Sequence, residues 1–369
     1  MISKLLLIGA ALLLFVAPLH AQSKPTILEW LAADNQGRFT TLVAALKATG
    51  LDATLETTAP NTLLAPTDSA FKTLADFLGD TNAQLLADTA TLKRVLLYHI
   101  LPGRVFFREL VKGDPIATAL DGKTVQGKLA NGFLTIGDAQ ASDVDISAAD
   151  GVIQVLGSVL VPADILPSAH LRVADFSPDS PGLDVYVDGS LTLFQAFGFP
   201  LVTGWMELPA AVHTIAFTTN GGSLDQAVII PADFTLRPNS WTTLAAVGSV
   251  AKGTLFPVLI SEDATPIPPG KARMMVLNAV EGAPPLDFRL NSAVVVSRLG
   301  FPFSLGDNNG YFSFDQTAGS YQVSATNYGQ TTPLETKLPA MKFEAGTHYL
   351  IAVVGSVDQP KLIVSADQR

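Results

Sequence analysis

The pattern of apolar and polar residues divides the chain into a helical first part and a strand-rich remainder. Between residues 25 and 98, apolar side chains recur at intervals of three and four, which places them on one face of a helix. The first two such segments run from Ile27 to Leu31 and from Phe39 to Leu46. Gly50 suits a left-handed cap at the end of the second. We therefore predict helices up to about Tyr98.

The stretch from Asn61 to Phe71 predicts a strand, a turn and a helix in direct succession. Residues 62–65 form a short apolar run typical of a buried strand. Pro66 ends this strand, because it has no N–H to give to a sheet. Thr67 and Asp68 are helix N-cap residue types, and apolar residues at helical spacing follow them. We expect this polar pair to satisfy free N–H groups of the first helical turn.

Beyond Pro102 the pattern changes to short runs that predict strands. These runs are Val105–Phe107, Thr124–Lys128, Phe133–Ile136 and Val152–Leu160. The dipeptide Asn131-Gly132 between two of them favours a hairpin turn. Helices that precede strands within one segment predict an α+β domain, which we place at residues 25–162.

Three motifs in this segment resemble, in their order, the signatures of the fasciclin domain of secreted adhesion proteins. They are Asn61–Phe71, the Tyr-His motif Tyr98–Gly103, and Ile146–Pro162. The family usually has Asn where this chain has Asp150, and often His where it has Gln154. We expect both positions to serve turn and packing geometry.

The resemblance implies a fold of helices plus a β-sandwich wedge and a role in adhesion. It implies binding roles for Tyr98 and His99, although a structural role for His99 at the helix end is the alternative. The residues that belong to the signatures with structural roles are Thr67, Asp68, Asp150 and Gly151.

From Leu171 onward the chain repeats itself. Four matched blocks occur in the same order: Arg172 and Arg273, LDVYVDG from Leu183 and LDFRLN from Leu286, Gly198-Phe199-Pro200 and Gly300-Phe301-Pro302, and AVGSV from Ala246 and VVGSV from Val353. Each copy alternates apolar and polar residues between turns, as immunoglobulin-like sandwiches do. We predict two all-β sandwiches, at residues 171–264 and 272–368, joined by a stiff Pro-rich linker. The pair is similar to a tandem domain of unknown function in secreted bacterial proteins, a resemblance that implies no chemistry.

Residues 1–21 have the pattern of a secretory signal peptide. Lys4 precedes an apolar run from Leu5 to Leu19, which is shorter than the about 20 residues that a membrane-spanning helix needs. Ala21 is a small residue at the expected cleavage site before Gln22, and an uncleaved N-terminal anchor is the alternative. We predict a secreted protein without an integral membrane span after signal removal, located outside the cell, on its surface or in the periplasm.

Composition narrows the possible partners. Of the 369 residues, 48% are hydrophobic and 15% are charged, which indicates a globular rather than a disordered chain. The formal net charge is −10, and loss of Lys4 with the signal makes it −11. An acidic chain without a basic cluster disfavours nucleic acid as a partner. The chain has no Cys, which excludes disulfides and is more typical of bacterial than of animal secreted proteins.

Motifs of catalysis and metal binding are missing from the sequence. The five histidines show no spacing typical of zinc ligands. There is no Gly-x-Ser-x-Gly, phosphate loop or dinucleotide motif, and we expect Ser249 and Ser356 to mark a bulge or turn. The oxygen-rich segments Asp138–Asp150 and Asp307–Gly310 lack the alternating ligands of a calcium loop. We therefore expect no metal and no cofactor, and we interpret Lys112-Gly113-Asp114, which resembles an integrin-recognition tripeptide, as a turn.

These observations predict a non-catalytic adhesion or extracellular matrix protein, with a fasciclin-like domain on a stalk of two β-sandwiches. It would bind cells, polysaccharide or a matrix protein through the fasciclin-like domain. The second hypothesis is a soluble carrier of an apolar small molecule such as a carotenoid, which some fasciclin-like proteins resemble. The candidate apolar patch is Leu101, Val105, Phe106 and Phe107. An enzyme would need polar residues that come together only in three dimensions.

Overall fold

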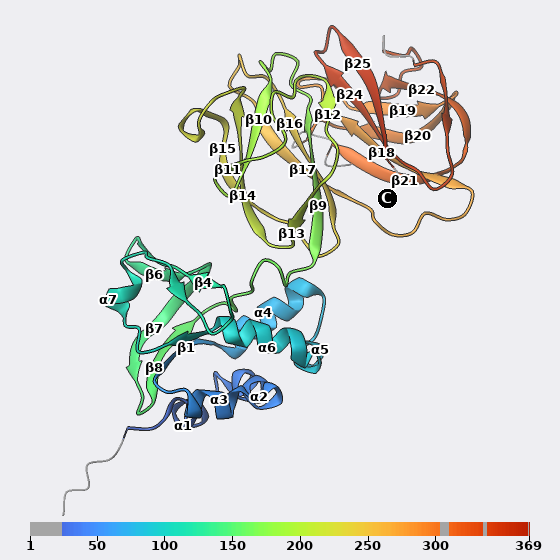
Figure 1. Ribbon diagram of the computed structural model, residues 1–369. Helices are drawn as coiled ribbons and strands as arrows, with labels where there is room; N and C mark the ends of the chain where they lie inside the picture. Colours follow the sequence, from blue (N-terminus) through green and yellow to red (C-terminus); the bar gives the residue numbers. More distant parts are fainter. Residues whose placement is uncertain (1–23, 303–309, 335–337, 368) are drawn as a thin grey trace, which may run out of the picture. The chain divides into compact units, whose positions relative to one another are not determined.

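The computed structural model describes residues 24–302, 310–334, 338–367 and 369. It divides into two compact units, Met1–Pro162 and Ala163–Arg369 (Figure 1). The predicted signal peptide, and Asp307 to Asn309 of the second oxygen-rich segment, lie outside the described residues.

The α-helices of the described chain all belong to the first unit. They are α1 (Ile27–Ala32), α2 (Thr40–Thr49), α3 (Leu51–Thr57), α4 (Asp68–Leu78), α5 (Asn82–Ala87), α6 (Thr89–Tyr98) and α7 (Phe107–Leu110). The predicted helices up to Tyr98 are confirmed, and Gly50 ends α2 in the left-handed conformation with φ 69°. The apolar faces of α2, α4 and α6 bury Leu46, Phe71 and Leu96 in one core.

One sheet runs through this unit in the order β2-β1-β8-β7-β6-β5. Its strands are β1 (Asn61–Pro66), β2 (Ile100–Pro102), β5 (Gly127–Ala130), β6 (Phe133–Ile136), β7 (Ala139–Ser147) and β8 (Gly151–Leu156), and β3 (Ile116–Ala117) pairs separately with β4 (Thr124–Val125). Leu63 of β1 faces the helical core, whereas Leu64 faces a second apolar core. Burial on both faces explains why β1 is a continuous apolar run rather than an alternating one.

Three strand predictions in this unit differ from the structure. Residues 105–107 form no strand, because α7 begins at Phe107. The carboxylate of Glu109 accepts the Phe106 N–H at 3.0 Å, and Asp145 Oδ1 accepts the Phe107 N–H at 2.7 Å, so acceptors from two segments stabilise the start of this helix. The segment Thr124–Lys128 divides between β4 and β5, and β8 ends at Leu156 rather than at Leu160.

The second unit contains two sandwiches of equivalent topology. The first has sheets β11-β10-β14-β15 and β12-β9-β16-β17, with β13 also on β9; the second has β20-β19-β22-β23 and β21-β18-β24-β25. In both, the first strand pairs in parallel with the penultimate one, β9 with β16 and β18 with β24. The two predicted all-β sandwiches are therefore present, with the same order of equivalent strands.

The strands of the first sandwich are β9 (Ser168–Asp175), β10 (Leu183–Val187), β11 (Ser190–Leu191), β12 (Leu201–Val202), β13 (Met206–Pro209), β14 (Val212–Thr219), β15 (Ala227–Thr235), β16 (Trp241–Val247) and β17 (Phe256–Glu262). Those of the second are β18 (Lys271–Asn278), β19 (Leu286–Leu290), β20 (Ala293–Leu299), β21 (Tyr311–Thr317), β22 (Gly319–Asn327), β23 (Ala340–Phe343), β24 (His348–Gly355) and β25 (Pro360–Asp367). A short 3₁₀ helix, Leu224–Gln226, precedes β15.

The two sandwiches share an apolar cluster. In β18, Met274 and Val276 point into the core of the second sandwich. Met275 and Leu277 point the other way and pack in a cluster that includes Phe176 of the first sandwich. The inner sheets are therefore buried on both faces, and the two sandwiches form one packed unit rather than two domains held only by a linker.

The duplication places unlike residues at one buried position. Asp175 ends β9 and Asn278 ends β18. Asp175 Oδ1 accepts the Ser177 N–H at 3.0 Å, and Asn278 Oδ1 accepts the corresponding N–H in the second copy at 3.2 Å. The Asn278 amide also donates to Leu299 O at 3.1 Å, whereas Asp175 Oδ2 is buried without a hydrogen bond of ordinary length, and the Ser180 hydroxyl near this carboxylate offsets only part of its burial. Burial raises the pKa of Asp175 from 3.8 to about 6.

Replacement of Asp175 by Asn is expected to raise the free energy of unfolding at pH 7.5 by about 3 kcal/mol, the cost that this pKa rise represents. Between pH 3.8 and 6 the unfolded chain has lost the proton that the folded chain retains, so the cost develops as the pH rises through this window. At pH 3.5 the substitution should be nearly neutral. Urea unfolding at both pH values measures the difference. The reverse substitution in the second copy, Asn278→Asp, serves as a control and should lower the free energy of unfolding at pH 7.5. An equal effect of Asp175→Asn at the two pH values would contradict the expectation.

Candidate functional site

The three fasciclin-like motifs meet around β1. This strand pairs antiparallel with β2, which lies within the Tyr-His motif, and parallel with β8 of the closing motif. The Leu64 N–H donates to His99 O at 2.8 Å, and the Asn61 N–H donates to Asp150 O at 3.2 Å. Motifs separated by up to about 90 residues of sequence thus form one hydrogen-bonded centre.

Thr67 and Asp68 cap two helices rather than one. Thr67 Oγ1 accepts the Ala70 N–H at 3.4 Å in the first turn of α4. Asp68 Oδ1 instead accepts the Thr41 N–H of α2 at 2.7 Å. The residue at the N-cap of α2, Phe39, has no side-chain acceptor, so the carboxylate supplies the missing cap and a favourable charge at that terminus.

Asp150 and Gly151 hold the turn before β8 against α1. Asp150 Oδ1 accepts the N–H of Ile27, the first residue of α1, at 2.8 Å. A Cβ on Gly151 would lie 2.0 Å from Asn61 O, so the parallel pairing of β1 and β8 leaves no space for a side chain there.

Gln154 occupies the position where the family often has His, and it is fully buried. Its Oε1 accepts the Asp145 N–H at 2.8 Å, and its Nε2 donates to Val105 O and to Asp145 Oδ1, both at 3.0 Å. The amide therefore satisfies both of its polar atoms within the protein.

His99 is fully buried, and both of its ring nitrogens are occupied. Nδ1 lies 2.8 Å from Val95 O, and Nε2 lies 3.0 Å from the backbone N of Leu160. A carbonyl needs a donor and an N–H needs an acceptor, so these contacts require the neutral ring with its proton on Nδ1. Burial lowers the pKa of His99 from 6.5 to about 4, which keeps the ring neutral at pH 7.

Tyr98, in contrast, is partly exposed. Its hydroxyl donates to Thr124 O at 3.1 Å, and its ring packs against the second apolar core. Partial burial raises the pKa of this hydroxyl, and the charge of Asp138 adds to the rise. Of the two residues in the Tyr-His motif, Tyr98 is the one that solvent and a partner can reach.

The candidate patch for an apolar ligand does not form one exposed surface. Leu101 is fully buried in the second apolar core, and Val105 and Phe107 pack against that same core. Phe106 is partly buried, with the Arg108 guanidinium 5.6 Å from its ring centroid.

A cluster of charged side chains is buried where the two sandwiches meet. Arg172 is 2% exposed; its Nη2 lies 2.7 Å from Glu262 Oε1, and its Nε donates to Thr243 Oγ1 at 2.8 Å. Arg369 also pairs with Glu262. Both guanidinium groups lie over the ring of Trp205, at 4.4 and 4.9 Å from its centroid.

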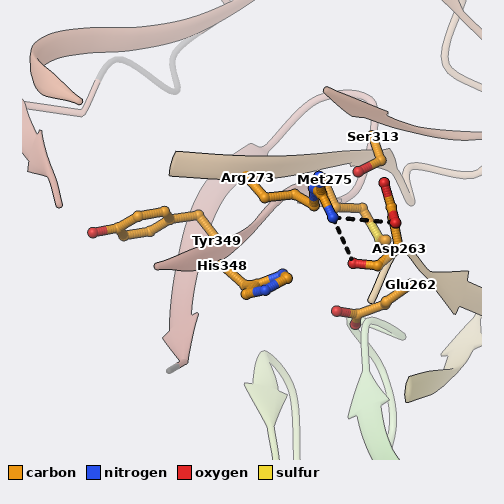
Figure 2. Close-up of a pocket in the computed structure, with 7 residues that line it drawn as sticks. All are labelled: Glu262, Asp263, Arg273, Met275, Ser313, His348 and Tyr349. Atoms are coloured by element: carbon orange, nitrogen blue, oxygen red, sulfur yellow. Dashed lines mark hydrogen bonds and ion pairs between the residues drawn. The ribbon is translucent and has the colours of Figure 1, made fainter. Parts of the chain in front are cut away.

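The predicted match of Arg172 with Arg273 is wrong: in the two parallel strand pairs Arg172 lies opposite Thr243, whereas Met275 lies opposite the equivalent residue Leu350, and Arg273 takes the place of His170. Arg273 has its own carboxylate partners. Its Nε lies 2.8 Å from Asp315 Oδ1, and its Nη1 lies 3.1 Å from Asp263 Oδ1. Figure 2 shows this guanidinium directed at Asp263, with the Tyr349 ring turned away. The cavity beside them, also lined by Glu262 and His348, has a volume of about 10 Å³, the size of a single water molecule. It is therefore too small for an organic ligand.

Within the part of the chain that the structure describes, no three acidic or His side chains lie close enough to hold a metal ion. Asp143 instead pairs with Arg38 at 3.0 Å. No helix among the described residues is both long and apolar enough to cross a membrane.

Comparisons with known proteins agree with the two kinds of domain. The model of the fasciclin domain matches residues 37–162, and that of a domain of unknown function, DUF4397, matches residues 169–289 and 272–369. Protein sll1483 of Synechocystis sp. is 33% identical over 148 residues, which cover 40% of this chain and 79% of that protein.

Two further proteins are similar to part of this chain. Transforming growth factor-beta-induced protein ig-h3 of Sus scrofa is 33% identical over 142 residues, which cover 37% of this chain but 19% of that protein. A solved FAS1 domain pair from the insect cell adhesion molecule Fasciclin I is 16% identical, with a TM-score of 0.35, and covers 39% of this chain and 53% of that chain. From the family models and the Synechocystis relative, the chain belongs to the fasciclin-domain family and carries a tandem DUF4397 region after its fasciclin domain.

Proposed function

We propose that this protein is a secreted or cell-surface adhesion protein that binds cells, polysaccharide or a matrix protein through its fasciclin domain, without catalysis. The observation that carries the proposal is the fasciclin match over residues 37–162, whose three motifs join around β1. The family is one of secreted adhesion proteins, and a function that uses broad surfaces needs no deep pocket.

Within the Tyr-His motif, we assign the two residues different roles. Tyr98 offers a partly exposed aromatic ring with a polar tip, the kind of side chain that is enriched at binding interfaces. His99 has both nitrogens engaged inside the protein, so it would position the end of α6 rather than touch a partner.

The test is binding of the chain that begins at Gln22 to intact cells and to panels of extracellular polysaccharides and matrix proteins. We expect saturable binding that Tyr98→Ala weakens about tenfold, as loss of an aromatic anchor does. Tyr98→Phe is the matched control, since it keeps the ring and should retain most of the binding.

His99 is left unchanged, because its removal would damage the fold, and circular dichroism verifies that each variant is folded. Absence of binding to every surface would refute the adhesion proposal. Unchanged binding by folded Tyr98→Ala would refute the role of Tyr98 and move the contact elsewhere.

A further inference from the structure

The duplicated sandwiches provide an internal comparison, because side chains that the fold requires should recur in both copies. In the first copy, Asp184 of β10 joins two loops at one end of the sandwich. Its Oδ1 accepts the Ala196 N–H at 2.7 Å, and its Oδ2 accepts the Gly221 N–H at 2.8 Å. Ala196 has the left-handed φ of 52°.

The second copy repeats this anchor atom for atom. Asp287 of β19 accepts the Arg298 N–H at 3.0 Å through Oδ1 and the Gly329 N–H at 3.1 Å through Oδ2. Arg298 has a φ of 55°, close to the value of its counterpart. The backbone of these two loops is therefore part of the shared fold.

The side chains at the loop tips differ between the copies. Arg298 stands where the first copy has Ala196, and Tyr328 stands where it has Asn220. The Arg298 guanidinium lies 5.8 Å from the centroid of the Tyr328 ring, and Tyr328 is 53% exposed. The first copy forms the same loops without this cation–π pair, so the fold does not require it.

Tyr328 lines a cavity of about 560 Å³ at this end of the second sandwich, and this cavity is largely open to solvent. The volume lies in the range of sites that hold small organic ligands. Pro285 and Pro333 form rigid parts of its wall, and Asn327, Gln330 and Thr332 contribute amide and hydroxyl groups. The described residues that line the cavity are uncharged.

We propose that this cavity binds a segment of a neutral polysaccharide, with one sugar ring against Tyr328. A sugar ring presents apolar C–H groups on its face and hydroxyls around its edge. An aromatic face flanked by amide and hydroxyl groups complements both, since these groups can donate and accept hydrogen bonds. An acidic polysaccharide fits less well, because the chain has a net charge of −10. This site belongs to the DUF4397 region and is independent of the fasciclin contact proposed above.

Affinity electrophoresis of the chain that begins at Gln22 tests the proposal. The native gels contain a soluble β-glucan, a galactomannan or a xylan as neutral probes, and polygalacturonate as the acidic probe. We expect at least one neutral polymer to retard the protein, and Tyr328→Ala to weaken that binding about tenfold or more. Asn220→Ala alters the equivalent tip of the first copy and should leave the retardation unchanged.

Three results would overturn the proposal: no retardation by any neutral polymer, retardation by polygalacturonate alone, or unchanged retardation of folded Tyr328→Ala. In the first of these cases, binding of a decaproline peptide that Tyr328→Ala abolishes would assign the cavity to a proline-rich partner. The neutral polymer should retard Tyr98→Ala as strongly as the unsubstituted chain. If Tyr98→Ala lost cell binding but was still retarded by the neutral polymer, the fasciclin contact and this site would be shown to be separate. The failure of one proposal therefore does not affect the other.

Discussion

Replacement of Arg172 by Met is expected to lower the free energy of unfolding by about 3–5 kcal/mol, because removal of one partner from a buried ion pair leaves an uncompensated charge. Arg172 and Arg369 balance Glu262 and Asp367 in the buried cluster between the sandwiches. Met preserves much of the side-chain volume, so the loss reports charge and hydrogen bonds more than packing.

Urea unfolding measures this loss in a Trp30→Phe background, where Trp205 and Trp241 report on the second unit. Addition of Glu262→Gln to Arg172→Met removes the excess negative charge and should recover part of the stability. Lys342→Met is the matched control: it breaks an ion pair with Glu344 whose members are 71% and 56% exposed, and it should leave the unfolding midpoint nearly unchanged. An Arg172→Met effect as small as that of the control would show that the cluster does not stabilise the fold.

Acid is expected to destabilise the fasciclin domain through His99, by about 3 kcal/mol as the pH falls from above 6.5 to 4. The pKa of His99 in the folded chain is lowered from 6.5 to about 4 by burial. In this window the unfolded chain binds a proton that the folded chain does not, so stability falls as the pH falls. Protonation would also remove the acceptor for the Leu160 N–H.

The helical signal in circular dichroism follows this domain, since the described α-helices belong to it. Urea unfolding at several pH values should give a steep dependence of stability on pH between 4 and 6.5. His99→Asn should flatten that slope even though it lowers stability overall. His213→Asn, in the first sandwich, should leave this pH dependence unchanged. If His99→Asn kept the full pH dependence, groups other than His99 would be responsible for it.

The local parts of the fold follow from local sequence signals. The apolar run at residues 62–65, the cap residue Thr67 and the glycine at position 50 each specify structure through neighbours within a few residues. Strand propensity with turn residues, together with the four repeated blocks, is sufficient to predict two sandwiches after the fasciclin domain. The strands β18 and β24 are continuous apolar runs, a pattern that indicates burial on both faces of a sheet. The prediction of alternating apolar and polar residues did not take this pattern into account.

Contacts between distant residues were not predictable in this way. Asp68 has the sequence context of a cap for α4, yet its carboxylate reaches α2. Phe107 has the propensity of a strand residue, yet Asp145 accepts its N–H and starts a helix.

For the candidate sites, the sequence by itself determined the family motifs and the presence of Tyr98, His99, Arg172 and Arg273. The tertiary structure decided that His99 is enclosed and Tyr98 accessible, that Arg172 faces Glu262, and that Arg298 lies against Tyr328. The physical reason is that backbone propensity depends on sequence neighbours, whereas burial and ion pairing depend on which strands and loops the topology brings together. The interior of a protein makes these contacts strong, because buried polar groups must find partners there.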